Sequence, residues 1–236
     1  MIFISPPFGN YLSLPKTISI RGSFTLNERP GKWIQIAKTL RYKPLFGGWV
    51  NKIGLRNPGI DYAIKTYKSG EIISIAIMEK KELFILLKKI PEHMDIELNI
   101  SCPNTEKHMI NEGVSKFLNN KRKWCILKLS PTESFKNIDN YYLQGFRQFH
   151  CSNTIPTPLG GLSGPMLKYY NYILINYIKN KFPDTEIIAG GGIQSVNDIN
   201  FYKHIGADHF SISSVFFSPI TSMFLFKSIY FSNKYY

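Results

Sequence analysis

Residues 96–104, Ile-Glu-Leu-Asn-Ile-Ser-Cys-Pro-Asn, carry the pattern that decides the fold of this chain. Apolar and polar residues alternate up to Ser101, as in a β-strand with one buried face and one face open to a ligand. Pro103 cannot continue the hydrogen-bond ladder, so the pattern predicts a strand over Ile96–Ser101 that ends at the thiol of Cys102. A cysteine at this point serves either catalysis or, as a small apolar residue, burial in a turn. The segment alone favours neither interpretation.

Short apolar runs alternate with longer amphipathic runs along the rest of the chain, the pattern of βα units around a parallel sheet. Eight short runs have strand character, and eight is the number of strands that closes a βα barrel. The predicted strands are Ile2–Ser5, Ile18–Ser23, Ile72–Ile77, Ile96–Ser101, Trp124–Leu129, Phe149–Asn153, Glu186–Ala189 and His209–Ser213. We therefore predict an α/β fold, a TIM (β/α)8 barrel, with residues 1–236 as a single domain.

Four longer segments are predicted as helices of this barrel: Glu79–Ile90, Met166–Lys181, Ser195–His204 and Pro219–Tyr230. The last is apolar and aromatic, and its place in the pattern favours the final barrel helix over a membrane anchor. The first βα unit is expected to be reduced, because residues 6–17 between the first two strands include three prolines. A crossover with a full helix needs at least about 10–12 residues.

The composition excludes several classes of protein. Hydrophobic residues make up 44% of the chain, enough for a sizeable core and too many for wholesale disorder. The three cysteines form no CxxC pair and no zinc pattern, which indicates a reducing compartment and no metal site. No apolar run is long enough to span a bilayer, and the N-terminal residues lack the basic region of a signal peptide. We therefore expect a cytoplasmic protein without an integral membrane segment.

The formal net charge is +13, which attracts nucleic acid, anionic lipid or small anions. The lysines are scattered among asparagine, isoleucine and tyrosine, and no long basic block stands out. Nucleic-acid binding is therefore not expected. Attraction of ligands that carry phosphate or carboxylate groups explains the sign equally well.

Polar residues gather where the predicted strands end: Ser23, Asn99, Ser101, Cys102, Asn104, Lys128, Ser130, Ser152, Asn153, Thr154, Ser213 and Ser214, with Asn51 in the loop before the third strand. In a parallel barrel these ends share one face, where active sites lie. Lys128 stands in an apolar strand, so it either meets a bound anion or reaches solvent over a packed stem. Gly190–Gly192 could let backbone N–H groups approach a phosphate, or could merely form a tight turn.

The whole pattern resembles the dihydroorotate dehydrogenase family, flavin enzymes of pyrimidine synthesis built on this barrel. The matching segments are Gly22–Leu26, Asn51–Asn57, Asn99–Asn104, Lys128, Ser152–Thr154, Gly160–Gly164, Gly190–Gly192 and Ser213-Ser214, in family order. The cysteine at position 102 resembles the soluble branch of the family, since the membrane-associated branch has serine there. Relative to the family, the chain looks shortened at both ends.

The resemblance implies an FMN cofactor across the strand ends and a pyrimidine substrate, dihydroorotate or a close dihydropyrimidine, that is oxidised to orotate. The implied FMN contacts are Ser23, Asn99, Lys128, Ser152, Gly164, Gly191, Gly192, Ser213 and Ser214. The implied substrate contacts are Asn51, Gly54, Leu55, Asn99, Asn104, Asn153 and Thr154. Cys102 would be the catalytic base, Lys128 would stabilise negative charge on the reduced flavin, and residues 105–113 would form a lid. A homodimer would fit the soluble branch.

Two positions depart from the family pattern. Pro6-Pro7-Phe8-Gly9-Asn10 replaces an Ala-Ser-Gly type of flavin contact, and Gly22, next to Arg21, replaces an expected lysine. Two other functions therefore stay open: a catalytically impaired protein that binds flavin or phosphate, and a phosphate-site barrel enzyme without a redox cofactor. The electron acceptor also stays open among fumarate, NAD through a partner subunit, quinone and oxygen.

Overall fold

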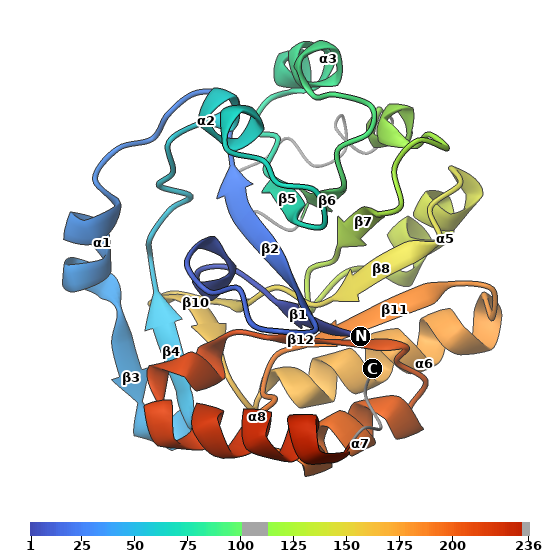
Figure 1. Cartoon of the computed structure of the whole chain (residues 1–236). Coiled ribbons are helices and arrows are strands. Elements are labelled where there is room, and N and C mark those ends of the chain that lie inside the picture. The colour runs from blue at the N-terminus through green and yellow to red at the C-terminus, as the bar shows by residue number, and fades with distance from the viewer. Residues whose placement is uncertain (101–112, 233–236) are drawn as a thin grey trace.

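The computed structural model describes residues 1–100 and 113–232, and these residues form a closed barrel of eight parallel strands (Figure 1). The barrel strands are β1 (Ile2–Ile4), β2 (Thr17–Phe24), β5 (Ile72–Ile75), β6 (Ile96–Asn99), β7 (Cys125–Lys128), β8 (Gln148–Cys151), β11 (Glu186–Gly190) and β12 (His209–Ile212). They pair in chain order, and β12 closes the ring against β1. The predicted TIM barrel is confirmed, and each strand coincides with a predicted strand to within a few residues.

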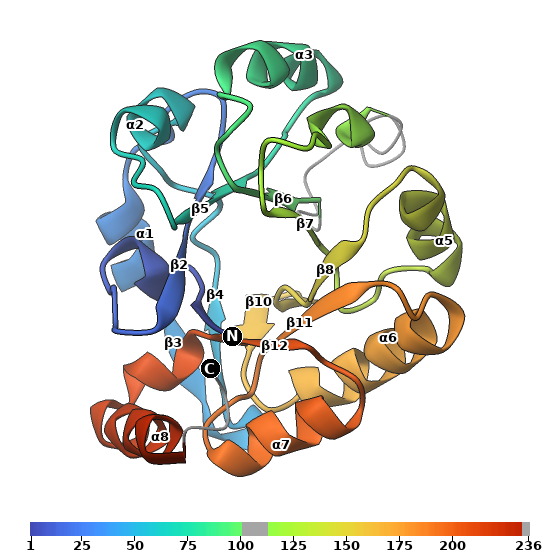
Figure 2. The ribbon, with the colours of Figure 1, turned by 45° about the vertical axis from the view of Figure 1, so that its right-hand side comes forward.

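Helices surround the barrel, as the view in Figure 2 shows. They are α1 (Lys32–Thr39), α2 (Ile60–Lys65), α3 (Lys80–Lys89), α5 (Phe135–Leu143), α6 (Leu167–Lys181), α7 (Val196–His204) and α8 (Pro219–Ser232). The four predicted helices are confirmed as α3, α6, α7 and α8. Helix α7 begins where the sequence indicates, because Ser195 and Asp198 cap each other's backbone N–H groups reciprocally.

The first βα unit is reduced, as predicted. Only a single 3₁₀ turn, Phe8–Asn10, lies between β1 and β2. The last helix reaches over to this region: the hydroxyl of Tyr230 donates a hydrogen bond of 2.9 Å to the carbonyl oxygen of Pro15. In residues 1–100 and 113–232, no helix is both long and apolar enough to cross a membrane.

A second, antiparallel sheet was not predicted. Its strands are β3 (Arg41–Lys43), β4 (Gly48–Asn51), β10 (Gly160–Ser163) and β9 (Ile155–Thr157), in that order across the sheet. These strands are only three or four residues long, and three of them contain glycine or proline, so they lack the periodic alternation by which a strand is identified in a sequence. The sheet joins the segment after β2 to the segment after β8, and it pairs Asn51 with Gly161. It therefore brings two remote parts of the chain together beside the barrel.

The interior of the barrel is divided along its strands. An apolar cluster of six fully or almost fully buried residues, separate from the larger core outside the strands, consists of Phe3, Ile20, Ile72, Trp124, Ile126 and Ile188. Two positions further toward the carboxyl end, Phe3, Ile72 and Ile126 are followed by the polar residues Ser5, Ser74 and Lys128. Three more buried polar residues, Glu97, His150 and Ser211, lie on β6, β8 and β12. We call these six residues the polar layer. Because successive inward positions are two residues apart, the change from apolar to polar takes one step along a strand.

Candidate active site

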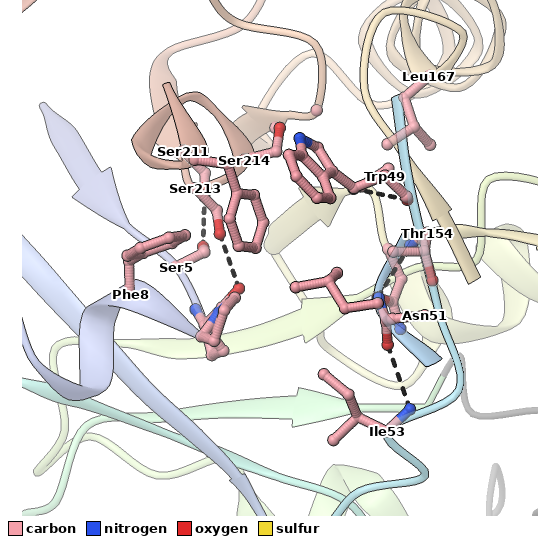
Figure 3. A pocket seen from close by; sticks show the side chains of 18 of the residues that line it. Ser5, Phe8, Trp49, Asn51, Ile53, Thr154, Leu167, Ser211, Ser213 and Ser214 are labelled. Atoms are coloured by element: carbon pink, nitrogen blue, oxygen red, sulfur yellow. Dashed lines mark hydrogen bonds between the residues drawn. The ribbon is translucent and has the colours of Figure 1, made fainter. Parts of the chain in front are cut away.

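A cavity of about 340 Å³ lies against the carboxyl ends of the barrel strands, between the barrel and the antiparallel sheet. This volume is within the range of small-molecule binding pockets. Figure 3 shows Ser5, Ser211, Ser213 and Ser214 on one side of the cavity and Asn51, Ile53 and Thr154 on the other. The site therefore lies on the face of the barrel that the strand-end residues predict.

Nine of the predicted site residues line this cavity: Asn51, Lys128, Ser152, Asn153, Thr154, Gly191, Gly192, Ser213 and Ser214. Gly164 lies behind the lining, its carbonyl oxygen 3.1 Å from the position that a Cβ atom on Gly192 would take. Gly54 and Leu55 follow the lining residue Ile53, and both adopt positive φ angles, 67° and 55°. Cys102, Asn104 and residues 105–112 of the predicted lid lie outside the described residues.

Ser23 and Asn99 do not line the cavity but join its wall to the barrel interior through a chain of hydrogen bonds. Asn153 donates to the Oδ1 of Asn99 over 3.3 Å, and Asn99 donates to the Oγ of Ser23 over 2.9 Å. The Ser23 and Ser74 hydroxyls are 2.9 Å apart, and the Ser74 hydroxyl donates to Glu97 over 2.7 Å. Since each residue fixes the rotamer of the next, the amides at the strand ends are held in place before any ligand binds.

The charged centre of the site consists of Lys128, Glu97 and His150. Glu97 is fully buried, and its two oxygens lie 3.6 Å from the Lys128 Nζ and 2.6 Å from the His150 Nδ1. Burial by itself would raise the pKa of Glu97, but the charge of Lys128 and the bond from His150 outweigh it and lower the pKa to about 2. Burial and the charge of Lys128 lower the pKa of His150, although Glu97 opposes them. Glu97 is therefore an anion beside a neutral imidazole.

Lys128 lies in the wall of the cavity. It is 8% exposed and lines the cavity rather than reaching bulk solvent. Glu97 and His150, by contrast, were not identified from the sequence as site residues. A glutamate and a histidine in separate strands give no local signal that they pair, since 53 positions separate them.

The glycines after β11 and the serines after β12 form the other end of the cavity. A Cβ atom on Gly191 would lie 2.6 Å from the Leu167 side chain, so the tight approach of this loop to α6 requires glycine. The hydroxyl of Ser213 donates to the carbonyl oxygen of Pro6 over 2.9 Å. Lys168, paired with Asp198, passes 3.3 Å from the Cβ position of Gly192. This end of the cavity combines glycine backbone, hydroxyl groups and a nearby cation, which suit a phosphate group.

Aromatic side chains close the remaining wall, and no pattern in the sequence marked them as site residues. The Trp49 and Phe217 rings are 4.6 Å apart between centroids, and Phe217 also contacts Phe8 at 5.0 Å. Pro6, Pro7 and Phe8 line the cavity where the family pattern has small residues. Arg21 does not take the place of the expected lysine, because it lies on the outer side of β2 and pairs with Glu71 at 2.9 Å.

Two cysteines in the described part of the chain, Cys125 and Cys151, are buried and form no disulfide. Burial raises the pKa of the Cys125 thiol to about 12 and raises the pKa of the Cys151 thiol even further above its usual range. Neither thiol is therefore available as a thiolate at neutral pH. Within residues 1–100 and 113–232, no group of three or more His, Cys, Asp or Glu side chains could hold a metal ion.

The fold and the site together define a TIM-barrel enzyme whose cavity lies at the carboxyl ends of the strands. Comparison with known proteins specifies the family. The chain is 32% identical to the catalytic subunit of dihydroorotate dehydrogenase B (NAD(+)) of Petrotoga mobilis, over 78% of this chain and 70% of that protein. It is 30% identical to the Staphylococcus carnosus protein of the same name, over 76% and 70% of the two chains, and 26% identical to that of Thermotoga maritima, over 92% and 91%.

The chain belongs to the dihydroorotate dehydrogenase family of flavin oxidoreductases. Among solved structures, dihydroorotate dehydrogenase of Eimeria tenella in complex with ferulenol shares the fold, with a TM-score of 0.74, 14% sequence identity and coverage of 97% of this chain and 80% of that one. No family model matches the sequence.

Proposed function

We propose that this protein oxidises dihydroorotate, or a close dihydropyrimidine, to orotate with FMN as the cofactor. The observation that carries the proposal is the cavity at the strand ends, into which Lys128 projects beside a preorganised chain of amides and hydroxyls. The named activity of the relatives supports the same reaction, since they are dihydroorotate dehydrogenases.

The residues present fit FMN. The glycines and hydroxyls around Gly191, Gly192, Ser213 and Ser214 would hold its phosphate, together with Gly164. Ser23, Asn99, Lys128 and Ser152 would hold the ring and the ribityl chain. When bound, FMN supplies the acceptor for a hydride. Lys128 supplies positive charge at a site shielded from solvent, where it stabilises negative charge more strongly than it would in water.

The substrate would be held by residues that can both donate and accept hydrogen bonds. Asn51 and Thr154 lie on the antiparallel sheet and beside it, and Asn99 and Asn153 are bonded to each other. Amide side chains of this kind match a pyrimidine ring, which carries alternating carbonyl and N–H groups. Gly54, Leu55 and Asn104 would complete the set. The sheet that the sequence did not reveal would therefore position Asn51 and, directly beside it, Thr154.

Cys102 would act as the base that takes a proton from the ring carbon next to a carbonyl group. A free thiol titrates near about 8.5, so a closed site and nearby positive charge would favour its thiolate. Of the other two cysteines, neither can replace it, because burial raises both of their pKa values.

The quaternary structure and the location belong to the proposal as well. We expect a homodimer in the cytoplasm, where a reducing environment keeps Cys125 and Cys151 as thiols. The relatives are named catalytic subunits, which suggests an additional, non-identical subunit. The molar mass from light scattering tests the homodimer: a mass of two chains would support it, and a mass of one chain would contradict it.

The deciding experiment is anaerobic absorbance of the purified, FMN-supplied protein before and after dihydroorotate is added. The proposal predicts that the yellow flavin band is bleached. Cys102→Ala should still bind the flavin but should no longer bleach it. The control is Cys125→Ala, which removes a buried thiol whose pKa is raised to about 12; this variant should both bind the flavin and bleach it. A bound flavin that stays oxidised with the wild-type protein would contradict the substrate. A protein that binds no flavin would overturn the redox function.

A further inference from the structure

The carboxylate of Glu97 is shared unequally between its neighbours in the polar layer. One oxygen accepts a hydrogen bond of 2.7 Å from Ser74 and lies 3.6 Å from the Lys128 Nζ, and the other lies 2.6 Å from the His150 Nδ1. The distance of 3.6 Å is longer than a hydrogen bond between an ammonium and a carboxylate. Lys128 is therefore attracted to Glu97 without a hydrogen bond to it, and Lys128 also lines the cavity.

His150 has one proton to give, and the structure determines where it lies. Burial lowers the pKa of His150, so the ring is neutral and carries a single N–H group. Because an ionised carboxylate only accepts hydrogen bonds, that proton must be on Nδ1, next to Glu97. The short bond of 2.6 Å then fixes one carboxylate oxygen on the imidazole, while the other oxygen stays 3.6 Å from the Lys128 Nζ.

The neighbouring strand leaves room for this ring. On Gly190 a Cβ atom would lie 2.8 Å from the His150 Nε2 and 3.1 Å from the Ser211 Cβ. A side chain at position 190 would therefore displace the imidazole. Gly190 on β11 therefore provides the space that the large side chain of His150 on β8 occupies.

We propose that His150 is a positioning residue for Lys128. By binding one oxygen of Glu97, it keeps the carboxylate from closing onto the ammonium group, so that the positive charge of Lys128 stays directed toward the ligand in the cavity. This inference rests on the proposed function for the identity of the ligand, FMN. The positioning itself is a property of the flavin-free protein.

The first test is structural and needs no flavin. In a crystal structure of flavin-free His150→Phe, Glu97 should close onto Lys128, and the Nζ–Oε1 distance should fall from 3.6 Å to hydrogen-bond length, about 2.8 Å. The distance should stay near the wild-type value in His150→Gln, which retains an N–H donor. An unchanged distance in His150→Phe would overturn the inference, whether or not the protein binds flavin.

The second test measures FMN binding and the midpoint potential of the bound flavin. His150→Phe should weaken FMN binding about tenfold, a change of ~1.4 kcal/mol, and make the potential more negative. Glu97→Gln combined with His150→Phe should restore both, because a neutral amide does not attract the ammonium. If the double variant is no better than His150→Phe alone, His150 does not act through Glu97.

The chain provides a matched control at the other end of the barrel. His209 pairs with Glu186 at 2.6 Å and does not line the cavity at the strand ends. His209→Phe breaks a pair of the same chemistry, so it should lower thermal stability without changing FMN binding or the potential. If His209→Phe and His150→Phe change the midpoint potential of the bound flavin equally, His150 contributes only to stability and does not position Lys128. Failure of the wild-type protein to bind FMN would instead contradict the proposed function, and the first test would still decide the inference.

Discussion

The two ends of the barrel are made by the same eight strands, yet they differ in almost every physical property. The amino-terminal end is filled by an apolar cluster that includes Phe3, Ile126 and Ile188. The carboxyl end holds the polar layer, with Glu97, Lys128 and His150 at its centre. Even the paired histidines differ: His150 is almost fully buried beside the cavity, whereas His209 lies beside the N-terminal amine of Met1.

This difference separates the part of the barrel that stabilises the fold from the part that prepares a site. Burying apolar side chains lowers the free energy of folding in proportion to their area. A buried carboxylate and ammonium contribute little net stability once their loss of hydration is counted, so their presence in a barrel centre indicates a role in binding or catalysis. On β7 the boundary between the two parts falls between Ile126 and Lys128.

The largest effect on stability is expected from the apolar end. Ile126→Ala leaves a cavity in the close-packed cluster and should lower the free energy of unfolding by about 2–5 kcal/mol. FMN affinity, measured on the folded fraction, should stay close to the wild-type value. Denaturant unfolding and flavin fluorescence quenching give the two quantities. If Ile126→Ala kept the wild-type stability but lost flavin binding, the apolar end would contribute to binding and the two ends would not be distinct in function.

The second largest effect is expected from acid, which should lower the free energy of unfolding through the polar layer. Glu97 has a pKa of about 2 in the folded protein against 4.5 as its ordinary value. Its contribution to stability is therefore complete above about pH 4.5, and up to about 3 kcal/mol is lost as the pH falls toward 2. The lowered pKa of His150 acts in the same direction at pH values below 6.5. Between pH 4.5 and 2 the unfolding free energy of the wild type should therefore fall by up to about 3 kcal/mol more than that of Glu97→Gln, and parallel curves would contradict the assignment.

Lys128 at the carboxyl end of β7 and Lys123, which precedes β7, should differ in function. Lys128→Ala removes a cation from the cavity and should weaken FMN binding by about 2 kcal/mol, the range of hydrogen bonds to charged groups, and also slow flavin reduction. Lys123→Ala removes a cation that lies 5.6 Å from the Trp124 ring at the amino-terminal end. Titration with FMN should show no change for this control. An unchanged affinity in Lys128→Ala would exclude that residue from the site.

Gly190→Ala tests the fit between β8 and β11. The added methyl group would meet the His150 ring and Ser211 at 2.8 Å and 3.1 Å, and such overpacking costs about 1–3 kcal/mol of stability. The loss caused by Gly190→Ala should be smaller in the His150→Ser background than in the wild type, because the smaller side chain leaves the methyl group its space. Thermal unfolding of the single and double variants measures the coupling, and additive losses would show that the two positions are independent.

The smallest effect concerns the serines that complete the polar layer. The hydroxyls of Ser5 and Ser211 bond each other across β1 and β12. Ser211→Ala should lower the free energy of unfolding by about 1 kcal/mol, because the partner hydroxyl loses its bond. The double variant Ser5→Ala/Ser211→Ala should cost little more than either single change. Chemical denaturation of the three variants would detect a departure from this pattern.

Much of the site was predictable because strand ends are visible in a sequence. Lys128, Ser152 and Asn153 stand directly after or within strongly alternating strands, so their shared face follows from the barrel. Trp49 and Phe217 gave no such signal, since aromatic residues in loops are as consistent with general packing as with a cavity wall. The sheet that carries Asn51 was missed because its pairing with residues 160–163 joins segments more than a hundred positions apart.

The sequence by itself determined the strands, their inward faces and the polar character of their carboxyl ends, because these follow from local alternation with a period of two. Only the tertiary structure decided that Glu97 contacts His150 at 2.6 Å and Lys128 at 3.6 Å, with Lys128 in the wall of the cavity. That choice depends on the order and register of β6, β7 and β8, which place side chains 53 positions apart within 2.6 Å of each other. Local patterns determine which way a side chain points, and strand register determines what it meets.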